Sequence, residues 1–201
     1  MTRRYDLDLI ASWIAPGSRV LDLGCGQGEL LEMLYAAKQV RGFGVERDEN
    51  RAAAGIARGV SILQGDIAEE VKGYPDQSFD FVVLSQTLQQ VPEPMPLIQE
   101  MLRVGRKAVV SFPNFAHWRC RCQHFFLGRA PVTPELPYEW HDTPNIRVIA
   151  FKDFISFCNR YGFPILEAAA VKTDPATGGG VVLSWMANVR ATYGIFLLGR
   201  S

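Results

Sequence analysis

Apolar stretches of strand length alternate along the chain with stretches in which apolar residues recur every three or four positions, the spacing of a helix face. The strand-like stretches are residues 19–24, 42–45, 60–63, 79–84, 107–111, 163–171 and 192–199, and the helix-like ones are 6–14, 28–37, 49–58, 94–103 and 151–161, with a short helical turn after Asp66. Several strands, such as FDFVVL at 79–84, are almost continuously apolar, which is typical of parallel strands buried on both faces. The pattern predicts an α/β fold, a doubly wound sheet of seven mostly parallel strands with helices on both faces.

The last two predicted strands need a different connection. Between them lie the glycine-rich segment TDPATGGG, residues 173–180, and a short irregular stretch, but no segment with the length of a crossover helix. Parallel neighbours require such a crossover. We therefore expect the last strand to run antiparallel to the one before it, as a hairpin, and residues 173–180 to form a mobile connection.

The composition narrows the range of partners and compartments. Lysine and arginine together number 21, as do aspartate and glutamate, so no net charge draws the chain to nucleic acid or anionic lipid. No apolar run approaches the roughly 20 residues that cross a bilayer. The cysteines number four, no secretory leader precedes the first helix, and Cys120 and Cys122 are too close in sequence for the usual zinc knuckle. We expect a single domain over residues 1–201 in the cytoplasm, with no metal site, no nucleic-acid partner and no membrane association.

Three glycines follow the first predicted strand in the segment VLDLGCGQGEL, residues 20–30. Ligands of open parallel sheets bind beyond the carboxyl ends of the strands, where Gly24 can turn the chain, Gly26 can leave room for a ligand and Gly28 can let the next helix pack closely. The spacing differs from the G-x-G-x-x-G of dinucleotide sites, and Glu29 in the first helical turn would repel a diphosphate. The turn therefore predicts a nucleoside ligand without phosphates.

Acidic residues stand at the ends of the next two predicted strands. Glu46 follows the second strand, where a carboxylate can accept hydrogen bonds from both hydroxyls of a ribose. Asp66 follows the third strand, where a carboxylate can accept from an adenine amino group while Ile67 packs on the ring. Both acids could instead cap the helices that follow them. Their place at successive strand ends, beside the glycine turn, favours a binding site.

Four segments, VLDLGCGQGEL, GVERDE, ILQGDI and FDFVVLSQTLQQV, resemble in this order the motifs of class I S-adenosylmethionine-dependent methyltransferases. Within that superfamily, SQTLQQVPEP, SFPNFAHWRCR and PYEWHDTPNIR resemble the methionine biosynthesis protein MetW family over nearly the whole chain. The resemblance implies a Rossmann-like class I methyltransferase fold with seven strands, the last antiparallel. It also implies S-adenosyl-L-methionine, or its product S-adenosyl-L-homocysteine, as the cofactor.

The resemblance also implies roles for individual residues. Asp22 and the glycine turn would surround the methionine part of the cofactor, while Ser85 and Gln86 would approach the sulfonium. Together with the ribose and adenine residues above, the predicted cofactor-binding set is Asp22, Gly24, Cys25, Gly26, Gly28, Glu46, Arg47, Asp66, Ile67, Ser85 and Gln86.

An aromatic-rich insertion at about residues 113–144 interrupts the alternation of strands and helices. It contains all three histidines of the chain, and His117, His141 and Tyr138 are candidate bases for a methyl transfer. The insertion could be a lid over the cofactor, a region whose aromatic residues pack onto the sheet, or an exposed surface of aromatics and arginines that docks a protein. The sequence leaves these three interpretations open.

Two functions are compatible with the resemblance. Members of the MetW family are linked to the acylation of homoserine, together with a MetX-type homoserine O-acyltransferase, which implies an activating or regulatory subunit of that enzyme. The sequence contains no G-x-S-x-G nucleophile elbow, so the acyl-transfer serine would come from the partner. That partner could dock through residues 113–144 or a neighbouring surface. The alternative is a methyltransferase acting on a small molecule. Enzymes that methylate the amino groups of nucleic-acid bases resemble one another in an Asn/Asp-Pro-Pro-aromatic sequence at the end of the fourth strand. This chain has SQTL there, at 85–88, which disfavours methylation of adenine or cytosine amino groups.

Overall fold

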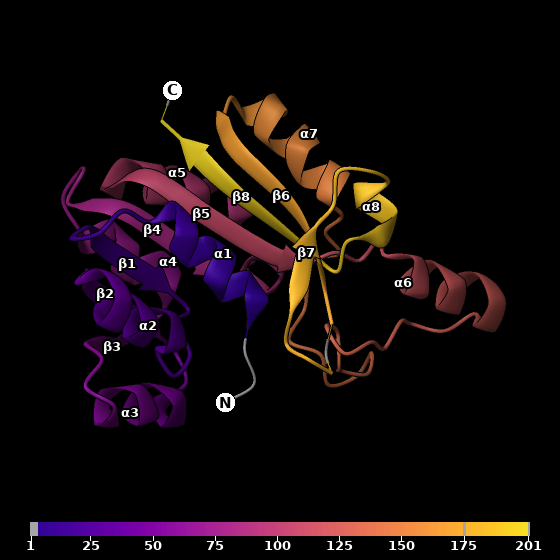
Figure 1. Cartoon of the computed structure of the whole chain (residues 1–201), viewed down its shortest axis with the longest axis horizontal. Coiled ribbons are helices and arrows are strands. Elements are labelled where there is room, and N and C mark those ends of the chain that lie inside the picture. Colours follow the sequence, from indigo (N-terminus) through magenta and orange to yellow (C-terminus); the bar gives the residue numbers. More distant parts are fainter. Residues whose placement is uncertain (1–3, 175, 201) are drawn as a thin grey trace.

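The computed structural model describes residues 4–174 and 176–200 and is organised around one eight-stranded sheet (Figure 1). The strands are β1 (Arg19–Leu23), β2 (Arg41–Glu46), β3 (Ile62–Gln64), β4 (Phe79–Ser85), β5 (Gly105–Pro113), β6 (Ile165–Thr173), β7 (Gly180–Val182) and β8 (Tyr193–Gly199). Their order across the sheet is β3-β2-β1-β4-β5-β8-β6-β7. The strands β1 to β5 pair in parallel, whereas β8 runs antiparallel to both β5 and β6. The predicted doubly wound, mostly parallel sheet is confirmed.

The predicted count of seven strands is wrong by one. The additional strand β7 pairs antiparallel with the end of β6, where Val181 lies opposite Lys172. Three residues beginning at Gly180 are too few for a periodic pattern, so the sequence predicts only a connection there. The antiparallel direction of the last strand is confirmed, but β7 and the short helix α8 (Ala187–Arg190) lie between β6 and β8 in place of a simple hairpin loop. The glycine-rich segment 173–180 instead joins β6 to β7, and its residue 175 lies outside the described residues.

Helices cover both faces of the sheet. They are α1 (Tyr5–Trp13), α2 (Glu29–Lys38), α3 (Glu49–Ala57), α4 (Ile67–Glu70), α5 (Pro94–Val104), α6 (Trp118–Cys122) and α7 (Phe151–Tyr161), with single turns η1 (Val71–Gly73) and η2 (Leu88–Gln90) and the π-helical segment η3 (Gln123–Leu127). The helices α1 and α2 bury Ile10 and Leu31 in one core cluster, and α5 and α7 bury Met101 and Phe154 in the other. The two clusters lie on opposite faces because side chains alternate along each strand. In the described part of the chain, no helix is both long enough and apolar enough to cross a membrane.

The strand order reverses at β1, which lies between β2 and β4. Leu23 at the end of β1 is in register with Val45 of β2, and Asp22 is in register with Val83 of β4. The loops that leave the carboxyl ends of these three strands therefore meet at one point of the sheet edge. Such a switch point is the usual ligand site of doubly wound folds.

Candidate functional site

A cavity of about 550 Å³ lies at this switch point. Its walls contain all residues predicted to contact a cofactor except Gly28, namely Asp22, Gly24, Cys25, Gly26, Glu46, Arg47, Asp66, Ile67, Ser85 and Gln86. Residues outside the predicted cofactor-binding set also line it: Arg4, Leu7, Gln27, Glu29, Leu30, Arg51, Ala68, Thr87, Gln90, Val91 and Pro92. The predicted residues thus come together, and the first turns of α1 and α2 complete the wall.

The three glycines of the turn have left-handed backbone conformations but different surroundings. A Cβ on Gly24 (φ 73°) would lie 2.6 Å from Oγ1 of Thr87, and one on Gly28 (φ 76°) would lie 2.9 Å from Cγ1 of Val60. A Cβ on Gly26 (φ 58°) would meet no atom within 4 Å. Gly28 therefore brings α2 close to its neighbours, whereas Gly26 leaves the backbone open toward the cavity.

Glu46 organises the cavity wall and does not cap a helix with its side chain. Its Oε2 accepts a hydrogen bond from the backbone N–H of Gly26 at 2.8 Å, and its Oε1 accepts from the N–H of Asp48 at 2.9 Å. The N-cap of α3 is Asp48, whose Oδ1 accepts from the N–H of Arg51 at 2.9 Å. Each carboxylate oxygen has a second lone pair, so Glu46 can also accept from ribose hydroxyls.

Asp66, by contrast, is a capping residue. Its Oδ1 accepts a hydrogen bond from the N–H of Ala68 at 2.8 Å and so begins α4. The capping interpretation is confirmed for this acid. The cap fixes the carboxylate beside Ile67 on the cavity wall, where it retains further acceptor capacity for an amino group.

Asp22 carries a buried oxygen that lacks a partner. Its side chain is 2% exposed, and within the described chain its Oδ1 has no hydrogen-bond donor. The pKa of Asp22 is raised to about 7, mainly by burial; the charge of Arg4 opposes the rise, and the charge of Glu46 adds a smaller contribution to it. An unpaired buried carboxylate is costly, and a bound cationic group would relieve that cost. The oxygen on this wall therefore fits the ammonium group of an amino-acid ligand.

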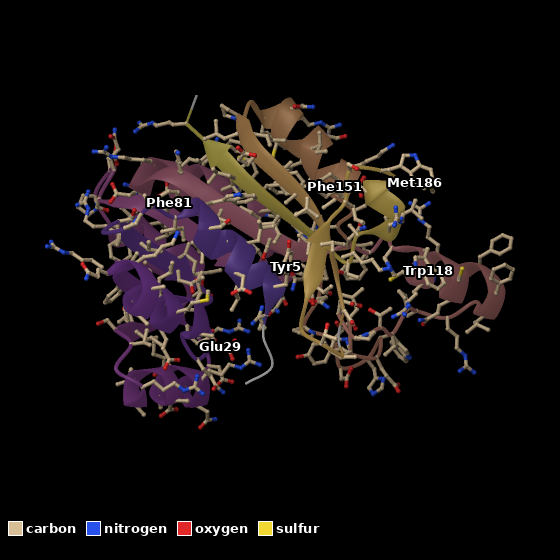
Figure 2. All side chains as sticks on the ribbon, viewed as in Figure 1. Tyr5, Glu29, Phe81, Trp118, Phe151 and Met186 are labelled. Atoms are coloured by element: carbon tan, nitrogen blue, oxygen red, sulfur yellow. The ribbon has the colours of Figure 1, made fainter. Side chains whose placement is uncertain are left out.

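Arg4 places a guanidinium on the cavity wall beside the start of α1. It pairs with Asp6 at 2.7 Å and with Glu29, which is labelled in Figure 2, at 3.3 Å. Asp6 is buried and also accepts a hydrogen bond from Nε2 of Gln86 at 2.5 Å. A guanidinium in this position suits a ligand carboxylate. Arg4 was not predicted from the sequence, because it precedes the first helix and belongs to no motif.

The end of β4 is held in an unusual conformation. Gln86 has a φ of 53°, which is rare outside glycine, and its N–H donates to the carbonyl of Ser111 at 2.9 Å. Ser85 and Ser111 share a hydroxyl hydrogen bond of 3.1 Å. Such strain in a fixed loop is common at ligand sites. Cys25 also lines the cavity, and burial raises the pKa of its thiol, which keeps it protonated and unreactive.

The candidate bases of the insertion do not line this cavity. His117 is buried, its pKa is lowered by burial, and its Nδ1 accepts from the N–H of Arg119 at 3.4 Å, where it caps α6. His141 is exposed, with Nδ1 3.6 Å from a carboxylate oxygen of Glu139. Tyr138 lines a separate cavity of about 370 Å³ within the insertion. The described residues also include no group of three histidine, cysteine or acidic side chains that could hold a metal.

Most of the insertion's aromatic surface faces solvent. Phe125, Phe126 and Trp140 are 83%, 74% and 78% exposed, so these rings do not pack onto the sheet. The helical part, α6 and η3, extends away from the sheet (Figure 1). Of the three interpretations, the exposed aromatic surface describes these rings best.

The same arrangement of sheet and helices occurs in solved methyltransferase structures. A SAM-dependent methyltransferase from Thermotoga maritima, a possible histamine N-methyltransferase, is 17% identical with a TM-score of 0.70 over 98% of this chain and 87% of that one. The magnesium protoporphyrin IX methyltransferase of Synechocystis PCC 6803, solved with bound SAH, is 17% identical with a TM-score of 0.66 over 98% and 82%. The fold is that of the class I SAM-dependent methyltransferases. The family model for the methionine biosynthesis protein MetW matches residues 4–198, and the chain belongs to that family.

A curated relative joins this family to a second protein. The bifunctional methionine biosynthesis protein MetXA/MetW of Rhodopirellula baltica is 38% identical over 162 residues, which is 76% of this chain. The match spans only 26% of that relative's length. The family and the fold are thus shown, and the activity of the longer protein does not transfer with them.

Proposed function

We propose that the chain binds S-adenosyl-L-methionine, or S-adenosyl-L-homocysteine, in the cavity at the switch point. Asp22 would pair with the ammonium group and Arg4 with the carboxylate of the methionine part. Glu46 would accept from the ribose hydroxyls, and Asp66 with Ile67 would hold the adenine. The bound methionine form would supply an electrophilic methyl group. The observation that best supports this ligand is the buried, unpartnered oxygen of Asp22 on the wall of a cavity that Gly26 leaves open.

We further propose that the chain acts as an activating or regulatory subunit of a MetX-type homoserine O-acyltransferase. The relative in which MetXA and MetW share one polypeptide supports the association, because fused proteins often work together as separate chains elsewhere. The positions of His117, His141 and Tyr138 away from the cavity argue against their role as methyl-transfer bases. Cofactor binding would regulate the partner only if the two states of the complex differ in cofactor affinity.

The test measures acylation by the purified acyltransferase of the same organism. Homoserine acylation is followed with the enzyme alone, with this protein added, and with this protein plus either cofactor form. We expect the protein to change the acylation rate and the cofactor to alter that change. The binding-deficient variant Gly26→Ala should abolish the cofactor's effect but not the association. An unchanged acylation rate under all conditions would refute the subunit role.

The alternative, a methyltransferase acting on a small molecule, is favoured by the activity named for the solved structures of the same fold. It predicts transfer of label from methyl-labelled cofactor to a small-molecule fraction of a cell extract. The subunit hypothesis predicts no labelled product. The two functions are therefore separable by the same protein preparation.

A further inference from the structure

We propose that one element of the insertion docks the acyltransferase: the arm, which consists of α6 and η3 (residues 118–127) and ends in the tip Phe125–Leu127. The tip would insert into an apolar groove with an acidic rim on the partner. The inference rests on the proposed subunit function and adds the docking surface and the chemistry that recognises it.

The tip exposes apolar side chains that nothing in the described chain covers. Phe125, Phe126 and Leu127 are 83%, 74% and 65% exposed. The two phenyl rings contact each other edge to face, with centroids 5.0 Å apart. Contiguous exposed aromatics of this kind are typical of interaction sites, since each ring gains free energy when it leaves water.

The arm presents this tip on a fixed support. Cys120 is buried at the base of α6, and the amide group of Gln123 makes two hydrogen bonds of 2.9 Å with the backbone of Val132. The Nδ1 atom of His124 lies 2.9 Å from the carbonyl oxygen of Arg129, just past the end of η3. The backbone around the tip is thus already ordered. Docking such an element costs less entropy than docking a flexible loop.

The charge around the arm defines the partner's side of the interface. The arm itself, residues 118–127, contains Arg119 and Arg121 and no aspartate or glutamate, and Arg129 follows just past its end. The acids of the insertion, Glu135, Glu139 and Asp142, all belong to the segment after the arm, where Glu139 lines a hollow beside the arm. This local positive charge complements an acidic rim on the partner. It also disfavours a symmetric contact between the arms of two copies, because that contact would bring like charges together.

A hollow beside the arm favours a partner of fixed shape. The cavity of about 370 Å³ in the insertion is lined by side chains of the arm and by the segment after it, including Cys120, His124, Tyr138 and Trp140. A protruding apolar tip next to a hollow is the pattern of anchored protein interfaces, in which side chains from each partner fill pockets on the other. A bilayer offers no fixed side chain to fill such a hollow. The geometry therefore favours a protein over a membrane.

The test compares the affinity of three full-length variants for the acyltransferase of the same organism. The double substitution Phe125→Ser with Phe126→Ser removes the tip, and Arg129→Glu reverses one charge. Ile56→Ser is the matched control, because Ile56 is 54% exposed on α3, at the far end of the molecule from the arm in Figure 1. We expect the double variant to bind at least about 30-fold more weakly, the loss typical of hot-spot residues, and Arg129→Glu to weaken binding about tenfold at low salt. The control should bind as the parent does.

Each result decides the proposal. Equal binding by the parent and the double variant, with both folded by circular dichroism and binding SAH equally, would overturn the arm as the docking element and leave the subunit function intact. Absence of binding by the parent would overturn the subunit function and the docking role with it. Two other results would refute the proposal if the tip does not affect acyltransferase binding. Sedimentation with phosphatidylglycerol vesicles that requires the tip would assign the tip to lipid binding. A dimer of the parent that is lost only in the double variant would assign it to self-association.

Discussion

The carboxylate of Glu46 accepts a hydrogen bond from the backbone amide of Gly26 at 2.8 Å, so the residue at the end of β2 holds the loop that follows β1. The other carboxylate oxygen of Glu46 accepts from the amide of Asp48, which caps α3. One buried side chain therefore fixes two walls of the cavity before any ligand binds. Such preorganisation reduces the cost of binding.

Glu46→Gln should weaken S-adenosyl-L-homocysteine binding about 10- to 100-fold, since hydrogen bonds to a charged group contribute about 1.5–3 kcal/mol. The amide NH₂ of glutamine would also face a backbone N–H in place of one acceptor oxygen. Titration calorimetry measures the change. The exposed neighbour Glu49, replaced by glutamine, should bind as the parent does. Equal affinity for both variants would remove Glu46 from the ribose site.

Substitutions of Gly26 and Gly28 should affect different properties, cofactor affinity in the first case and stability in the second. Gly26→Ala places a Cβ in open space and costs about 1–2 kcal/mol for its left-handed backbone, but it obstructs the cavity. Gly28→Ala carries the same backbone cost and also collides with Val60. We expect the larger fall in melting temperature for Gly28→Ala and the larger loss of cofactor affinity for Gly26→Ala, measured by calorimetry on the folded fraction. The reverse order would contradict the roles given to these residues.

The raised pKa of Asp22, about 7, predicts cofactor binding that strengthens with pH. The carboxyl is protonated below pH 7 and cannot pair with an ammonium group, so affinity for S-adenosyl-L-homocysteine should rise about tenfold from pH 6 to pH 8. Asp22→Asn should bind weakly and with little pH dependence across that range. A parent protein whose affinity is the same at both pH values would contradict the pairing.

The raised pKa of Asp22 also predicts that, without ligand, the protein becomes less stable as the pH rises. Between about pH 4 and pH 7 the unfolded chain has lost the proton of Asp22 while the folded protein retains it, so the contribution of this group to the free energy of unfolding falls as pH rises. Asp22→Asn removes the buried charge and should raise the free energy of unfolding at pH 8 by about 1–3 kcal/mol. Urea titrations of both proteins at pH 5 and pH 8 measure the difference, which should shrink at pH 5.

Periodicity predicted the long elements because each buries a complete face, as Leu31 does on α2 and Met101 does on α5. It failed at β7, where three residues carry no repeat. The pairing of β7 depends on the neighbouring end of β6, a tertiary contact that no local pattern encodes.

The site was predictable where residues follow strand ends in sequence. The glycine turn and Glu46 stand at such ends, and parallel strands bring those ends together. Arg4 was missed because it reaches the cavity only through the packing of α1 against the sheet. In the insertion, the sequence suggested residues that do not line the cavity. His117 and His141 have the right chemistry for a base, but their positions depend on how the insertion folds, which no local pattern encodes.

The carbonyl of Gln89 accepts hydrogen bonds from the consecutive amides of Ile146 and Arg147, both at 3.0 Å. The residues that follow Gln89 along the chain, 90–92, line the cavity at the switch point, and the side-chain amide of Gln89 donates to the carbonyl of Gln86 at 2.6 Å. Hydrogen bonds therefore join the cavity wall directly to the segment that follows the insertion. A ligand that orders residues 86–92 should steady the segment that follows the arm.

Hydrogen exchange can detect this coupling. Saturating S-adenosyl-L-homocysteine should slow exchange of the Ile146 and Arg147 amides at least about threefold, because their acceptor becomes better ordered. The amides of α7, residues 151–161, serve as the internal reference and should change little. The same ligand concentration added to Gly26→Ala should give no protection, since the variant binds poorly. Protection confined to residues 86–92, with Ile146 and Arg147 unchanged, would show that cofactor binding does not reach the segment after the insertion through Gln89.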